Sequence, residues 1–157
     1  MAKIEDSIEL ESVDEFVKML DTMCDPIRNP SITSAQWQEV IDVLQEMERG
    51  FFASSVGPTG EPWVPLSPVT EAKKGHGIIL RETYELEASL IGFGPSAVRT
   101  SSSDSLEFGT SREWAWIHQK GSGKIPQREF IGFNQDGMDD VLSIVADAAV
   151  QMMFDAN

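Results

Sequence analysis

Apolar residues at helical spacing between positions 34 and 55 restrict the possible folds of this chain more than any other feature. The stripe is continuous and consists of Trp37, Val40, Ile41, Leu44, Met47 and Phe51. Ser34 precedes it and can cap a helix, because its hydroxyl can accept a hydrogen bond from a free backbone N–H. We therefore predict a helix that runs to about Ser55 and ends before Gly57-Pro58-Thr59-Gly60.

A second long helix is predicted near the C-terminus. Its apolar stripe comprises Met138, Val141, Leu142, Val145, Ala148, Ala149 and Met152. Asp136, Asp139 and Asp140 lie at its start, where the helix dipole favours negative charge. A metal site built from these three aspartates is the alternative interpretation.

The segment 57–77 is predicted to be a loop. Three prolines follow Pro58 within ten residues, and proline is excluded from helix interiors and central strands. Trp63 and Leu66 are its apolar anchors, which we expect to hold the loop against the core.

Short strands are predicted after this loop. Residues 86–93, 96–102 and 105–109 combine apolar residues with flanking turn residues, which is typical of an antiparallel meander. The serine run at 101–103 is then a hairpin turn. Together these patterns predict an α+β fold, with a small antiparallel sheet packed by a long helix in the N-terminal half and by a C-terminal helix.

The stretch from 113 to 133 combines an aromatic cluster, a glycine-rich turn and a proline-pinned apolar run. A catalytic loop, a structural clasp and a docking surface are all possible interpretations. We expect a short helix after Ser111 that packs on the sheet through Trp114, Trp116 and Ile117, followed by a tip at Gly121–Lys124. Pro126 and Arg128 would then set a strand through Phe130, Ile131 and Phe133, and His118 would be a hydrogen-bonded structural residue.

At 157 residues the chain suits one domain with a sizeable core. Residues 1–30 are predicted to form an acidic arm with a short helix over 12–22, and residues 31–157 the single α+β domain. Apolar runs are all shorter than the roughly 18 residues of a membrane span. Cys24 is the only cysteine, so no intrachain disulfide can form and a reducing, cytoplasmic origin is expected.

The net charge of −14 argues against a nucleic-acid-binding protein, because phosphate contacts require clustered Lys and Arg. Acidic residues are concentrated at both ends, in 1–30 and in 131–157, whereas 101–130 is balanced with four acids and four bases. Acidic ends either keep the protein soluble or repel DNA from a surface past which it must move.

Motifs of enzymes are poorly matched. Gly123-Lys124 lacks the earlier glycine and the following Ser or Thr of a phosphate-binding loop, and no Gly-x-Ser-x-Gly elbow occurs. Cys24 with His118 is a conceivable catalytic dyad, although nothing in the sequence marks Cys24 as activated. Two histidines and one cysteine cannot build a zinc site without carboxylates. We therefore predict a protein that is not an enzyme and has no cofactor.

A series of central motifs resembles a known family. The first is Pro62-Trp63-x-Pro65-Leu66-Ser67-x-x-Thr70, followed by a lysine at 73 or 74 and by Ile79-Leu80-x-x-Thr83-x-x-Leu86-x-x-Ser89-Leu90. The later ones are Phe108-Gly109, Trp114-Ala115-x-Ile117-His118-Gln119-x-Gly121 and Ile125-Pro126-x-Arg128-x-Phe130-Ile131-Gly132. Their order and spacing over residues 36–134 are similar to the virion morphogenesis, or tail completion, family of Mu-like tailed phages.

Three positions depart from the family's usual residues. Tyr84 stands where a Thr-Gly pair usually precedes the leucine at 86, Trp114 replaces a tyrosine, and Gln127 replaces an alanine. The departure at Tyr84 bears on a turn, because glycine accepts backbone conformations that tyrosine avoids. The helix over 12–22 lies outside the matched residues, which suggests an addition specific to this chain.

The resemblance implies a structural protein of the virion. Such proteins form a ring, expected to be sixfold, at the neck where head and tail meet; they contact neighbouring neck, connector and tail proteins, and DNA passes through without being specifically bound. It further implies assembly in the host cytoplasm and no membrane. The residues expected to build its core and interfaces are Trp63, Leu66, Leu86, Trp114, Ile117, His118, Pro126, Arg128 and Phe130. Two alternatives stay open: a small hydrolase using His118 or Cys24, and an acidic DNA mimic that inhibits a host protein.

Overall fold

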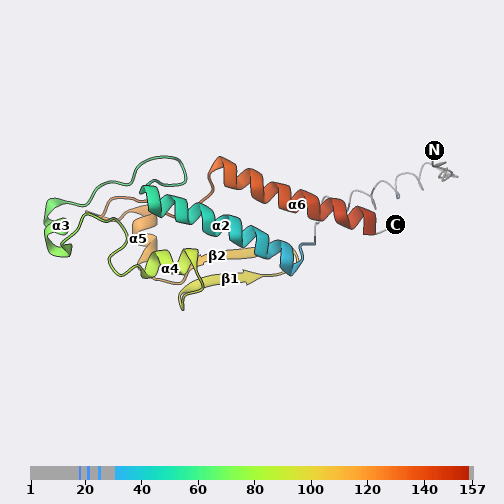
Figure 1. The fold of residues 1–157 in the computed structure, drawn as a ribbon, viewed down its shortest axis with the longest axis horizontal. Coiled ribbons are helices and arrows are strands. Elements are labelled where there is room, and N and C mark those ends of the chain that lie inside the picture. The colour runs from blue at the N-terminus through green and yellow to red at the C-terminus, as the bar shows by residue number, and fades with distance from the viewer. Residues whose placement is uncertain (1–17, 19–20, 22–24, 26–30, 156–157) are drawn as a thin grey trace.

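The long helix α2 (Ser34–Ser54) runs through the middle of the molecule (Figure 1). The computed structural model describes residues 18, 21, 25 and 31–155, so the predicted helix over 12–22 lies outside the described residues except for two positions. Helix α6 (Gln135–Asp155) lies along one side of α2, and α4 (Glu85–Ile91) and a two-stranded sheet lie on the other. The α+β fold with a small antiparallel sheet is therefore confirmed.

The N-cap of helix α2 lies one residue earlier than predicted. Thr33, not Ser34, is the N-cap: its Oγ1 accepts from the Gln36 backbone N–H at 3.2 Å, and its own N–H donates to Gln36 Oε1 at 2.9 Å. This reciprocal pair is a capping box. The helix ends at Ser54, and its C-cap Ser55 has a left-handed φ of 54°, so the predicted end near Ser55 is confirmed.

The sheet is a hairpin of β1 (Ala97–Ser101) and β2 (Leu106–Thr110). The strands are antiparallel, with Ala97 opposite Thr110 and Ser101 opposite Leu106. In the turn, the Ser102 N–H donates to the Ser105 carbonyl at 2.9 Å. The second and third predicted strands and the serine turn are thus confirmed.

The first predicted strand, 86–93, is wrong, because those residues lie mostly in helix α4. Leu86, Ser89 and Leu90 are its buried residues together with Glu87, and a spacing of three and four residues is helical. The Ser89 hydroxyl donates to the Leu86 carbonyl at 2.7 Å. A short apolar run fits an extended segment as well as a helix, but the period of this one favours a helix.

The loop prediction for 57–77 is wrong over seven residues, which form helix α3 (Pro68–Lys74). Ser67 caps this helix, and Pro68 occupies its first turn, where the missing N–H costs nothing. The predicted strand through Phe130, Ile131 and Phe133 is also wrong, since no strand is assigned between 126 and 134. The short helix expected after Ser111 is α5 (Ala115–Lys120).

Helix α6 packs closely on α2 at Gly137. A Cβ added there would lie 1.8 Å from Met47 Sδ, so only glycine allows this approach. Val141 and Ile144 of α6 join the same core as Leu106 of the sheet. Leu142, predicted to belong to the buried stripe, is instead 56% exposed.

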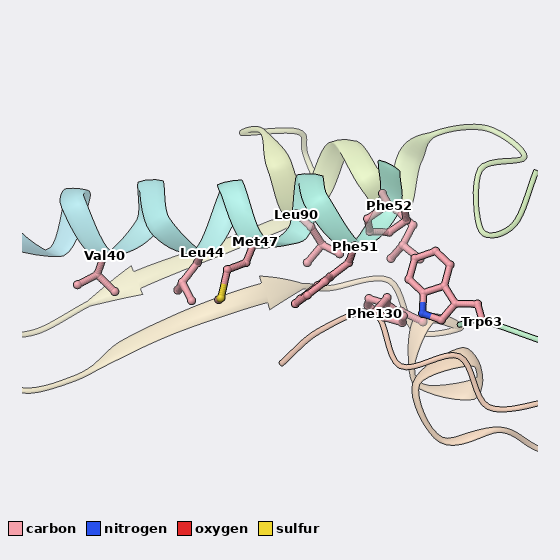
Figure 2. Close-up of a cluster of buried hydrophobic side chains, with 10 residues drawn as sticks. Val40, Leu44, Met47, Phe51, Phe52, Trp63, Leu90 and Phe130 are labelled. Atoms are coloured by element: carbon pink, nitrogen blue, oxygen red, sulfur yellow. The ribbon is translucent and has the colours of Figure 1, made fainter. Parts of the chain in front are cut away.

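The aromatic residues of the core gather at the C-terminal end of α2 (Figure 2). Figure 2 shows side chains of α2 pointing from the helix toward the strands, with Phe51, Phe52, Trp63 and Phe130 gathered where the helix ends. Phe52 and Trp63 meet edge to face, with ring centroids 5.3 Å apart. The loop and the 113–133 stretch therefore converge on one end of the central helix.

Candidate functional site

Residues 115–131 turn back on themselves and are called the clasp below. Helix α5 ends at Lys120, and its C-cap Gly121 has a φ of 75°. An added Cβ at Gly121 would lie 2.9 Å from the Gln127 nitrogen. The turn closes with Ser122 and Ile125, which exchange hydrogen bonds of 3.0 and 2.8 Å. The Arg128 N–H then donates to the His118 carbonyl at 2.7 Å, so the returning segment lies against the helix.

Gln119 holds the returning segment of the clasp. Its Oε1 accepts from the backbone N–H groups of Phe130 (3.1 Å) and Ile131 (3.2 Å), and its Nε2 donates to the Ile131 carbonyl at 2.9 Å. The side chain thus supplies the pairing that a neighbouring strand would otherwise give, which explains why no strand forms here. Sequence reasoning missed this role, although Gln119 directly follows Ile117 and His118 in the motif.

Arg128 joins the clasp to the proline-rich loop. Its side chain is buried, with 6% exposure for the residue, and its Nε and Nη2 donate to the carbonyls of Val64 (2.7 Å) and Pro65 (3.1 Å). In the other direction, Trp63 Nε1 donates to the Glu129 carbonyl at 2.6 Å. Burial lowers the pKa of the Arg128 guanidinium, which nevertheless stays charged at neutral pH.

These bonds bring together three residues that the sequence singled out: Trp63, Arg128 and Phe130. Phe130 is 2% exposed and Trp63 is 4% exposed, so both belong to the core at the end of α2. Leu66 and Pro126 are only half-buried. The carbonyls of Val64 and Pro65 lie outside the strands of the described chain, and an arginine fork is well suited to satisfy them.

Trp114, the N-cap of α5, and Trp116 within the helix do not pack on the sheet as predicted. Trp114 is 41% and Trp116 is 58% exposed, whereas Ala115 between them is 4% exposed. On a helix, successive side chains point about 100° apart, so burying Ala115 turns both neighbours away from the core. Ile117 is half-buried and lines a groove of about 420 Å³.

His118 lines the same groove, with Leu86, Trp114 and Ile125. Its ring meets Trp114 edge to face at 5.9 Å. Burial lowers the pKa of His118 below 6.5, and the positive charges of Arg128 and Lys74 lower it further, so the imidazole is neutral at pH 7. The His118 backbone carbonyl accepts from the Arg128 N–H, but the buried Nδ1 of its ring has no hydrogen-bond partner among the described residues, so the predicted hydrogen bond of the side chain stays a prediction.

A second buried polar arrangement was not predicted. Glu48 of α2 is 1% exposed, and burial raises its pKa to about 8, against the opposing effects of Arg99 and a hydrogen bond from the Gly132 backbone. The Arg99 guanidinium lies 3.8 Å from the centre of the Phe108 ring and donates to the carbonyls of Val98, Ser89, Leu90 and Gly109. The signal was present, since Glu48 continues the stripe at a four-residue spacing from Val40 and Leu44.

Within the part of the chain that the structure describes, no three His, Cys, Asp or Glu side chains are grouped closely enough to bind a metal ion. Cys24 lies outside the described residues, so a pairing with His118 stays a hypothesis. None of the helices that can be described is both long and apolar enough to cross a membrane.

The fold and the clasp define a small α+β protein in which Arg, Gln and Trp side chains hold irregular segments together. The chain belongs to the phage virion morphogenesis family, whose model matches residues 9–149. That match begins before the 12–22 segment, so the interpretation of this segment as an addition outside the family's region is wrong. No curated protein and no solved structure matches the chain.

Proposed function

We propose that this phage morphogenesis protein is a structural component of the neck, which completes the tail or joins it to the head. It would assemble with itself into a ring, most simply a hexamer, through which DNA passes. Its other partners would be the neighbouring neck, connector and tail proteins. It would act in the virion after assembly in the host cytoplasm, and not as an enzyme.

The main support for this proposal is the position of the motif residues in the fold of a chain that belongs to this family. The Pro62–Leu66, Ile117–Gly121 and Pro126–Ile131 motifs meet at one end of α2 and bond to one another. Arg128 and Gln119 direct their polar atoms at backbone groups of the same chain. Residues that bond to the backbone of their own chain stabilise its fold. A structural subunit of a particle requires such a stable fold.

The charge supports a role beside DNA. With a net charge of −14, the surface repels phosphates, and a ring of such subunits would let DNA slide without binding to it. Ring subunits also require surfaces for their neighbours, and several large apolar side chains are exposed, among them Trp116, Phe93 and Phe154.

Two measurements test the proposal together. Light scattering coupled to size exclusion should give a discrete oligomer, and negative-stain microscopy should show rings. Antibody labelling of purified phage should mark the junction of head and tail, and phage lacking the protein should accumulate unjoined heads and tails. A strictly monomeric protein that is missing from particles would contradict the proposal; if it also bound a basic host protein, the DNA-mimic alternative would be favoured.

A further inference from the structure

Helix α6 carries apolar side chains on the side that faces away from α2. Its inner side packs on α2 and joins the core through Val141 and Ile144. On the outer side, apolar residues recur every four positions and are exposed, and this outer row consists of Leu142, Ala146, Val150 and Phe154. At 100° per residue, the outer row lies opposite Val141 and Ile144. A surface helix needs only one apolar stripe, so the outer row indicates a contact with another segment.

The N-terminal segment has an apolar stripe of similar length. In the sequence this N-terminal stripe consists of Val13, Phe16, Val17 and Leu20 at helical spacing. Of the segment itself the structure describes Lys18, Asp21 and Asp25, which are helical and exposed. These three lie three and four residues apart, so they share a polar face turned away from the N-terminal stripe. A helix of only about 12–15 residues is marginal by itself, so this one needs an apolar surface to pack on.

The N-terminal segment joins the domain beside α6. The Ser31 N–H donates to Met152 Sδ at 3.1 Å, and the Ile32 N–H donates to the Ser103 carbonyl at 2.7 Å. Residues 26–30 connect Asp25 to Ser31 and can span at most about 20 Å. The outer row itself is about 18 Å long at 1.5 Å per residue. A segment that starts at Met152 therefore reaches only an α6 surface that lies close to this point.

The charges leave an apolar contact with acids at its rim. Helix α6 carries five acids and no base, whereas residues 12–24 carry three acids and Lys18. At 100° per residue, Asp14 and Asp21 lie beside the N-terminal stripe and Glu15 lies opposite to it. A second α6 would set five aspartates against five, so the N-terminal segment is the better partner for the outer row.

Because the outer row stays exposed in the single chain, we propose that residues 12–24 of one copy dock on the outer row of α6 in a neighbouring copy. Ala146 is the smallest side chain of the row and leaves room for a larger one between Leu142 and Val150, as in packing of ridges into grooves. If each copy passes its segment to the next, the contact is head-to-tail and can close into a ring. The inference supplies a contact for the proposed ring and rests on that proposal.

Cysteine cross-linking tests the contact directly. In a Cys24→Ser background, Val17→Cys and Ala146→Cys place one thiol near the middle of each apolar stripe. We expect a disulfide-linked dimer when the two variants are mixed under oxidation, and none with either variant alone. Glu107→Cys, at an exposed position of β2, replaces Ala146→Cys in the control mixture and should give no dimer.

The outcomes separate the contact from the ring. Covalent dimers of Ala146→Cys alone would overturn the inference in favour of a symmetric α6 contact. A chain with both cysteines that closes on itself as an oxidised monomer would also overturn it. Oligomers by light scattering without a cross-link in the mixture would overturn the contact and leave the ring standing. Cross-linking in assemblies that never exceed two copies would support the contact and overturn the ring.

Substitution with aspartate gives an independent measurement. Val17→Asp and Leu142→Asp should each weaken self-association by about tenfold or more, because each puts a charge into an apolar contact. Thr22→Asp adds the same charge opposite the N-terminal stripe and should change association less than about twofold. More salt should strengthen association of the unmodified protein, since the acids at the rim repel one another. Unchanged association of Val17→Asp and Leu142→Asp, or weakening by salt, would contradict the contact.

Discussion

Replacing Arg128 with alanine tests whether the clasp stabilises the fold. The side chain is buried and donates two hydrogen bonds, to the Val64 carbonyl at 2.7 Å and to the Pro65 carbonyl at 3.1 Å. Alanine removes both donors and leaves the two carbonyls unsatisfied. The loop and the clasp would then be joined mainly by Trp63.

The expected loss follows from these contacts. Hydrogen bonds from a charged group contribute about 1.5–3 kcal/mol each. The buried charge of Arg128 also carries a desolvation cost, which no salt bridge to a described carboxylate offsets. Removing the charge therefore recovers part of that cost. We therefore expect the free energy of unfolding to fall by about 2–4 kcal/mol. For a chain of this size that corresponds to a fall in Tm of roughly 4–16 °C.

Urea unfolding followed by tryptophan fluorescence would measure the change, because Trp63 lies in the affected core. Arg128→Lys keeps the charge but not the fork and should give an intermediate loss. Lys124→Ala changes an exposed cation of the same segment and should stay within about 0.5 kcal/mol of the unmodified protein. If Arg128→Ala also stayed within that range, the clasp would not be a stabilising element.

Three further predictions concern a side chain that holds the backbone, a buried carboxyl group and a residue in a strained backbone conformation. Gln119→Ala should lower the free energy of unfolding by about 2–3 kcal/mol in the same urea assay, because the N–H groups of Phe130 and Ile131 lose their acceptor; an unchanged midpoint would show that water replaces the amide. Glu48 has a folded pKa of about 8, above its unfolded value of 4.5, so the folded state binds the extra proton and stability should fall as pH rises from 4.5 to 8. Glu48→Gln should remove this pH dependence and stabilise the protein by a few kcal/mol at pH 8 but little at pH 5, and parallel Tm–pH curves for both proteins would refute this. Tyr84 has a φ of 57°, a left-handed conformation that glycine adopts without strain, and it is 52% exposed, so Tyr84→Gly should raise Tm or leave it unchanged; a loss above about 1 kcal/mol would mean that the tyrosine ring packs usefully.

Local sequence patterns were sufficient to predict the elements whose signals repeat along a helix or lie within a single turn. The stripes of α2 and α6 and the serine turn between β1 and β2 predicted their elements within a few residues. The same local approach failed where a short run fits two periods, as in α4, and where a proline sits in the first turn of a helix, as in α3. Both signals are present in the sequence, in the spacing of Leu86, Ser89 and Leu90 and in the position of Pro68 directly after Ser67.

The sequence by itself determined the class of fold, the family and the residues of the 113–133 stretch that carry the resemblance. Only the tertiary structure decided what those residues do. Arg128 bonds to carbonyls 63 and 64 positions away, and Gln119 replaces a missing strand partner 11 and 12 positions away. Whether a buried N–H or carbonyl is satisfied by a strand or by a side chain depends on which groups folding brings within about 3 Å, and no local period records that distance.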